Sequence, residues 1–179
     1  VQAHPEGFGF LTPESGGKDI FLSAREMRKL MNGDHAAVKI TGFDPRRERN
    51  EGHVVTVLER AHQSIVGRYY REKGIHFVIP DDKRIHEDIL LSEDYEHNAQ
   101  QGDIVLVRIL EYPNQHNQAI GMIETILGAE NAPGLEVTIA LNTHQIPHKW
   151  NEAVLQEIQQ IPAEVEEADK KGRLDLRDK

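Results

Sequence analysis

The sequence of 179 residues lacks cysteine, contains a single tryptophan and is only 6% aromatic. Without cysteine there are no disulfide bonds and no thiolate metal sites, which fits a reducing cytoplasm. The longest apolar runs, such as residues 104–107, are far shorter than the ~20 residues of a membrane-spanning helix. No basic and apolar leader of the secretory type is visible. We therefore expect a cytoplasmic chain without a membrane partner, and Val1 in place of methionine suggests a piece of a longer protein.

Positive charge is also scarce, and the net charge of −9 at first disfavours nucleic acid as a partner. The deficit is unevenly distributed. Residues 1–66 hold 9 basic and 9 acidic side chains, residues 67–128 hold 6 and 11, and residues 129–179 hold 6 and 10. Because binding to a polyanion depends on local patches, the neutral first third remains able to bind one.

A tandem repeat organises the chain from Val1 to Gly128. Four blocks recur in the same order: GFGFLTP (7–13) as GIHFVIP (74–80), DIFLS (19–23) as DILLS (88–92), NGDHAAVKI (32–40) as QGDIVLVRI (101–109), and GHVVTVL (52–58) as GMIETIL (121–127). Four ordered matches with one small slip in spacing indicate a duplication. We therefore assign residues 1–64 and 65–128 to two domains of one fold.

Short β-branched runs separated by turn residues predict strands in both copies. The clearest runs are 36–40, 53–58, 66–70, 104–110 and 120–127. Five such strands in each copy predict a small closed Greek-key barrel, so the fold class is mainly β with two tandem five-stranded OB-fold barrels. We expect a helical turn at residues 23–31 and a long exposed loop at the charged stretch 43–52.

Residues 129–179 differ in character and predict a short helical segment that leads into a further domain. The stretch after Pro133 reads as a helix, although LEVTIAL could also form a strand. Asn151 is the expected N-cap of a second helix with one apolar face, which Pro162 ends. The charged remainder is expected to be helical to about Lys171.

The stretch GFGFL places Phe8 and Phe10 on one face of a strand, because alternate side chains of a strand share a face. Phenylalanines in strands are usually core, and this alternative stays open on the pattern alone. Facing outward, the two rings and Phe21 on the next strand would form an apolar surface, which is costly unless it binds a partner. Bases stack on such rings irrespective of their identity.

Basic side chains near these rings are candidates for contacts with phosphates: Lys18, Arg25, Arg28 and Lys29. The second copy replaces two of the rings, because Ile75 and Leu90 stand where the first copy has Phe8 and Phe21. Its candidate residues are Arg68, Tyr70, Arg71, Lys73, Phe77, Lys83, Arg84 and His86. Tyr69 and Tyr70 should face opposite ways. We expect the first copy to bind nucleic acid better.

Ten histidines raise the question of a metal site. Only His144 and His148 have helical i, i+4 spacing, and Pro147 between them breaks the helix that would align them. Surface or structural roles are therefore favoured, and we predict no metal and no cofactor in this chain.

GFGFL followed by DIFLS resembles the paired nucleic-acid-binding motifs of cold-shock domains. The segments VGRY, FVIPDDKRI, DIL and GRLDLRD are more specific, and the whole chain resembles the amino-terminal part of ribonuclease R-type enzymes of the ribonuclease II family. The resemblance implies two cold-shock domains ahead of a catalytic domain. That domain would degrade single-stranded RNA from the 3′ end to 5′ nucleotides, with Mg²⁺ held by clustered aspartates.

The aspartate block of that family is expected just after GRLDLRD, where the sequence stops. Asp175 and Asp178 do not match its metal ligands, so we expect no catalytic residue here and no RNA cleavage by this chain alone. The expected partners are single-stranded RNA and the chain's own catalytic domain. Two alternatives stay open: a free-standing cold-shock-type RNA chaperone or regulator, and an OB module that binds protein.

Overall fold

The computed structural model describes all residues except 93–97, 131, 149, 162–169 and 173–179. The chain divides into two compact units, Val1–Gln145 and Ile146–Lys179, and each is described by itself. The first unit contains all ten strands found in the described residues, and it carries both copies of the repeat.

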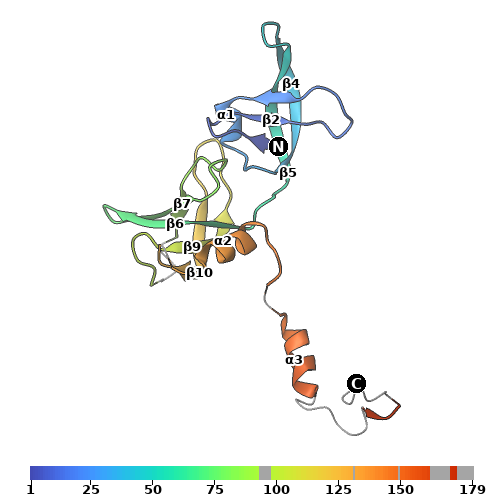
Figure 1. Cartoon of the computed structure of the whole chain (residues 1–179). Helices are drawn as coiled ribbons and strands as arrows, with labels where there is room; N and C mark the ends of the chain where they lie inside the picture. Colours follow the sequence, from blue (N-terminus) through green and yellow to red (C-terminus); the bar gives the residue numbers. More distant parts are fainter. Residues whose placement is uncertain (93–97, 131, 149, 162–169, 173–179) are drawn as a thin grey trace. The chain divides into compact units, whose positions relative to one another are not determined.

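The first copy forms a five-stranded sheet (Figure 1). Its strands are β1 (Gln2–Ala3), β2 (Gly9–Leu11), β3 (Ile20–Leu22), β4 (His35–Asp44) and β5 (Arg49–Glu59), in the order β1-β2-β3-β5-β4. The short helix α1 (Ala24–Met27) follows β3 and lies within the predicted helical turn. We call this sheet with α1 the first barrel domain.

The second copy is a closed barrel of β6 (Ser64–Glu72), β7 (Ile75–Pro80), β8 (Ile89–Leu91), β9 (Ile104–Glu111) and β10 (Ile120–Gly128). Its order, β10-β8-β7-β6-β9, repeats that of the first sheet, including the parallel pair of the third and fifth strands. The mainly β fold with two OB-type domains is confirmed.

The first sheet differs from the predicted barrel in that it is not closed. Closure of the second barrel depends on β6, whose residues 64–68 pair with β9 while residues 67–72 pair with β7. The equivalent strand β1 has only two residues, Gln2 and Ala3, and both pair with β2. It lacks the additional length by which β6 extends along β9, and β1 and β4 remain the two edges of the first sheet.

The prediction of a long exposed loop at residues 43–52 is wrong. β4 and β5 continue through this stretch as a hairpin, with Phe43 opposite Asn50 and Asp44 opposite Arg49. The Asp44 carboxylate accepts a hydrogen bond from the amide of Arg46 at 3.0 Å, which stabilises the turn locally. Charge alone therefore did not indicate a loop, because an exposed hairpin keeps charged side chains in water.

Each barrel has its own hydrophobic cluster, and each has a glycine on its last strand that lies close to the core. A Cβ on Gly52 would overlap the side chains of Val38 and Ile20, and a Cβ on Gly121 would overlap the side chain of Val107 and come into tight contact with Ile89. These positions correspond one to one between the two copies of the repeat. The two glycines therefore allow the last strand to approach the core closely.

The two predicted helices form. α2 (Leu135–Thr143) packs on the second barrel, where its buried Leu135 contacts a cluster with Val66 and Ile104. α3 (Glu152–Gln160) begins at the predicted cap, since the Asn151 side chain accepts a hydrogen bond from the amide of Val154 at 2.9 Å. The predicted end at Pro162 and most of the last helical segment lie outside the described residues. None of the described helices is long and apolar enough to cross a membrane.

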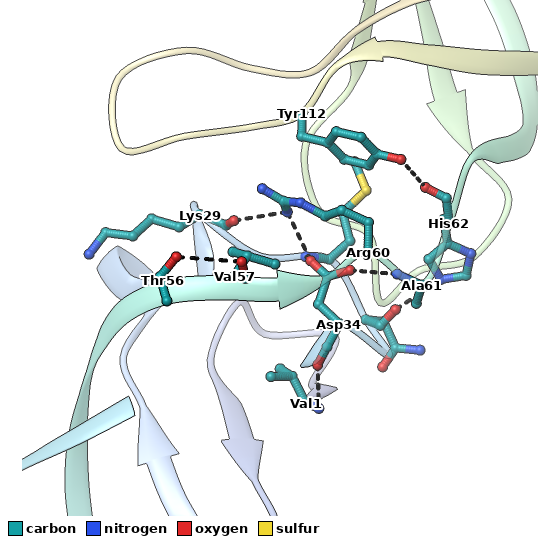
Figure 2. Close-up of polar contacts among 11 residues, drawn as sticks. Val1, Lys29, Asp34, Thr56, Val57, Arg60, Ala61, His62 and Tyr112 are labelled. Atoms are coloured by element: carbon teal, nitrogen blue, oxygen red, sulfur yellow. Dashed lines mark hydrogen bonds and ion pairs between the residues drawn. The ribbon is translucent and has the colours of Figure 1, made fainter. Parts of the chain in front are cut away.

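The Asp34 side chain binds the segment between the two barrels to the first barrel domain (Figure 2). Its side chain is fully buried and accepts hydrogen bonds from the amides of Met31 at 2.8 Å and Ala61 at 2.9 Å. It also forms an ion pair with the Arg60 guanidinium at 2.9 Å. The segment that joins β5 to β6 is therefore held by contacts to one carboxylate.

The same segment also contacts the second barrel (Figure 2). The guanidinium of Arg60 lies over the ring of Tyr112, 4.6 Å from its centroid. The Tyr112 hydroxyl donates a hydrogen bond to the carbonyl of His62 at 2.9 Å. Because Arg60 contacts both Asp34 and Tyr112, it joins the two barrels directly.

Candidate nucleic-acid interface

Phe8, Phe10 and Phe21 lie together on the first barrel domain, and we call these three rings the aromatic platform. All three pairs of ring centroids are 5.8 Å apart. Phe10 and Phe21 are paired across β2 and β3, which explains why two rings distant in sequence come into direct contact. The three side chains are half-buried.

The platform lies on the sheet face opposite the core. Ile20 and Leu22, the neighbours of Phe21 in β3, are buried in the core, so alternation directs Phe21 to the other face. Gly9 lies between Phe8 and Phe10, and a Cβ there would overlap the buried side chain of Met27. Glycine therefore leaves room for α1 beneath the platform.

Two further side chains stack on the platform. The imidazole of His4 lies parallel to Phe8, with 4.3 Å between centroids and 11° between planes. The guanidinium of Arg49 lies 3.5 Å from the centroid of Phe21. The sequence did not indicate either contact. Arg49 was missed because it belongs to the stretch that was assigned to a loop. Reading that stretch as a hairpin would have placed it beside β3.

The predicted basic residues of the first barrel are not equivalent. Lys18, Arg25 and Arg28 are exposed. Lys29 instead forms an ion pair with Glu26 at 2.9 Å. Burial alone would raise the pKa of Glu26, but hydrogen bonds from Lys29 and the Val54 amide, with the charge of Lys29, lower it. The Lys29 ammonium group is therefore engaged in an ion pair within the barrel, whereas the other three predicted cations are exposed.

In the second barrel, Tyr70 and Phe77 form a smaller aromatic pair. Their rings are stacked across β6 and β7 with centroids 5.8 Å apart. Tyr69 points inward, its hydroxyl is 2.9 Å from Nδ1 of His76, and burial raises its pKa. The orientation left open by the sequence is resolved, with Tyr70 on the outside.

Several predicted basic residues of this barrel already have acidic or carbonyl partners. Arg68 pairs with Glu130 at 2.5 Å, and Arg84 pairs with Asp82 at 2.8 Å. His86 lies 2.6 Å from the carbonyl oxygen of His4, a contact between the two barrels. The other predicted cations, Arg71, Lys73 and Lys83, are exposed. The first barrel therefore offers the stronger aromatic surface, and both offer exposed positive charge.

The described residues do not form a metal site. Among them, no group of three or more His, Asp or Glu side chains lies close enough to hold an ion. The aspartate cluster implied by the family resemblance is therefore not built from these residues.

Two family models match the chain: the ribonuclease B OB domain at residues 1–57 and the cold-shock domain at residues 77–151. Ribonuclease R from Acidithiobacillus ferrooxidans is 48% identical over 99% of this chain. Those from Vibrio cholerae and Escherichia coli are 40% identical over 99%. The chain is similar to ribonuclease R along its whole length. It covers 41% of the first of these relatives and 22% of the other two.

Solved structures give the same fold for ribonuclease R. Mycoplasma genitalium RNase R in complex with ribose-methylated single-stranded RNA matches 99% of this chain, with a TM-score of 0.76 and 17% identity over 28% of that protein. The same enzyme with double-stranded RNA matches 84% of the chain, with a TM-score of 0.58. The pseudonuclease Ssd1 of yeast matches 78%, with a TM-score of 0.61. At 17–21% identity these likenesses show the fold alone.

Proposed function

We propose that the two barrels bind single-stranded RNA and guide it within a ribonuclease R-like 3′–5′ exoribonuclease that releases 5′ nucleotides. The observation that carries this proposal is the aromatic platform, which faces away from the core although it consists of three large apolar rings. Such a surface is explained by a partner with planar apolar faces, and unpaired bases have them. The similarity to ribonuclease R over 99% of the chain supports the same reading.

Stacking and charge would act together in this binding. A base that stacks on a protein ring contributes about 1–3 kcal/mol, irrespective of sequence. Lys18, Arg25 and Arg28 are exposed on the same barrel and can neutralise phosphates. Binding of this kind suits an enzyme that must pass any RNA sequence along its surface.

The connection between the barrels supports a guiding role. Arg60 bonds to Asp34 of the first barrel and stacks on Tyr112 of the second, so one side chain contacts both barrels. In the proposed function, RNA that binds the platform continues to Tyr70 and the exposed cations of the second barrel. The described residues do not fit the Mg²⁺ cluster of the family, and we derive no hydrolytic step from them.

Fluorescence anisotropy with labelled oligo-U at several salt concentrations tests this function. We expect Phe10→Ala to weaken binding about 5-fold or more, because it removes a stacking ring. Phe43→Ala is the matched control, since Phe43 is 58% exposed on the same barrel but belongs to β4 and lies outside the platform. If the unaltered chain does not bind oligo-U at low salt, or if the two variants bind equally, the proposal is wrong.

A further inference from the structure

The platform is not bare in this structure, because each of two rings has a planar polar side chain stacked on it. His4 covers a face of Phe8 almost in parallel, and the guanidinium of Arg49 covers a face of Phe21. Distances of 4.3 Å and 3.5 Å leave no room for a base between these layers. A base that arrives must either displace the two side chains or stack on top of them.

Arg49 differs from three other arginines of the two barrels. Arg60, Arg68 and Arg84 each pair with a carboxylate. Within the part of the chain that the structure describes, the only side-chain interaction found for Arg49 is its contact with Phe21, and its Nε is buried without a hydrogen-bond acceptor. A buried donor without a partner is costly, and among the described residues no ion pair holds the Arg49 guanidinium as those of Arg60, Arg68 and Arg84 are held.

The second side chain on the platform, His4, has a hydrogen bond that orients its ring. It is exposed, and its Nδ1 accepts a hydrogen bond from the amide of Glu6 at 3.2 Å. An accepting Nδ1 leaves the proton of the neutral ring on Nε2, which is then a donor. The imidazole therefore combines a flat face, supported from behind by Phe8, with a hydrogen-bond donor at its edge.

The internal repeat supports the pairing of Arg49 with Phe21. In the second copy, Phe21 corresponds to Leu90 and Arg49 corresponds to Gln118. The cation and the ring on which it stacks are therefore both absent from that copy. A guanidinium needed only for the hairpin would not have to change together with a ring on a different strand.

We propose that His4 and Arg49 form the outer layer of the platform, and that RNA bases stack on these two side chains rather than directly on Phe8 and Phe21. Imidazole rings and guanidinium planes both accept stacked bases in single-stranded RNA recognition. Arg49 additionally supplies a charge-assisted donor to the adjacent phosphate. This inference rests on the proposed function, because it names the side chains through which that function acts.

Substitutions that separate the plane from the charge test the proposal in the oligo-U assay. Arg49→Lys keeps the charge and loses the plane, so affinity should fall about 5-fold or more with the salt slope unchanged. Arg49→Gln should lower the affinity further, because it removes the charge as well. It should also reduce the slope of log K against log salt by about 0.7, which is the contribution of one phosphate on a single strand. His4→Ala should lower the affinity about 5-fold or more, and His4→Phe, which keeps an aromatic ring, should lower it less.

The outcomes that contradict the proposal are distinct from those that contradict the function. If Phe10→Ala weakens binding while Arg49→Lys and His4→Ala do not, bases stack elsewhere on the platform, and only the outer layer is refuted. If Arg49→Gln or His4→Ala binds more tightly than the unaltered chain, the two side chains block the rings. If none of these variants changes binding, the platform does not bind RNA at all. Thermal unfolding of each variant, together with Phe43→Ala, verifies that the fold is retained.

Discussion

Replacing Asp34 with alanine should destabilise the first barrel more than any surface substitution. The change removes the acceptor of two amide hydrogen bonds and the anionic partner of Arg60, at a carboxylate that is itself fully buried. A hydrogen bond to a charged group contributes about 1.5–3 kcal/mol, and breaking a buried ion pair costs about 3–5 kcal/mol. These terms share one carboxylate and do not add, so we expect a loss of about 3–5 kcal/mol in the free energy of unfolding.

The repeat provides a matched control in Asp103, which occupies the equivalent turn. Its carboxylate accepts a hydrogen bond from the amide of Gln100 at 2.7 Å, and this contact is exposed. We expect Asp103→Ala to cost about 1 kcal/mol, the usual value for a single exposed bond. The difference between the two variants then measures the bonds that Asp34 makes to the segment between the barrels.

Urea unfolding followed by circular dichroism measures both variants. With a slope of about 2 kcal/mol per molar urea, Asp34→Ala should lower the midpoint by about 2 M and Asp103→Ala by about 0.5 M. Equal midpoints for the two variants would refute the role assigned to the buried carboxylate. A lower slope for Asp34→Ala alone would show instead that the variant changes the compactness of the native or unfolded state, or that its unfolding is no longer two-state.

Three further predictions follow from the structure. The lowered pKa of Glu26 stabilises the folded chain at pH values above the unfolded pKa of about 4.5, and this stabilisation is lost as the pH falls through the lower folded pKa. The unfolding midpoint of Glu26→Gln should therefore change less on acidification than that of the unaltered chain. Gly52→Ala should destabilise the first barrel by about 1–3 kcal/mol in urea unfolding, because its Cβ would overlap Val38 and Ile20. In an intact ribonuclease R-like enzyme, deleting both barrels should raise KM for RNA more than it lowers kcat, and an unchanged KM would contradict a guiding role.

The repeat and the alternation of side chains made much of the fold predictable from sequence. Each copy keeps the same strand order, and the outward position of Phe10 follows from its place between Gly9 and Leu11 in β2. The open first sheet was not predictable in this way. Strand runs indicate where pairing can begin, whereas closure depends on how many residues β1 supplies.

The sequence predicted only part of the candidate site, for a related reason. The aromatic rings are recognised by type and spacing, but Arg49 reaches Phe21 through the β4–β5 hairpin, which brings residues far apart in sequence together. The ion pairs of Arg68 and Arg84 were equally hidden, because a basic residue in sequence does not reveal its acidic neighbour in space. Counting basic residues therefore overstated the charge that is free for phosphates.

The position of Met31 has a consequence for how the two copies can be separated. This residue belongs to the first copy, yet it is buried in the hydrophobic cluster of the second barrel with Ile65, Tyr69 and Val107. A second barrel expressed alone would expose to water the apolar side chains that Met31 covers, and would lose the stabilisation that this burial provides. The boundary between the two repeats in sequence is therefore not the boundary between the two cores, because the core of the second barrel includes a side chain from the first copy.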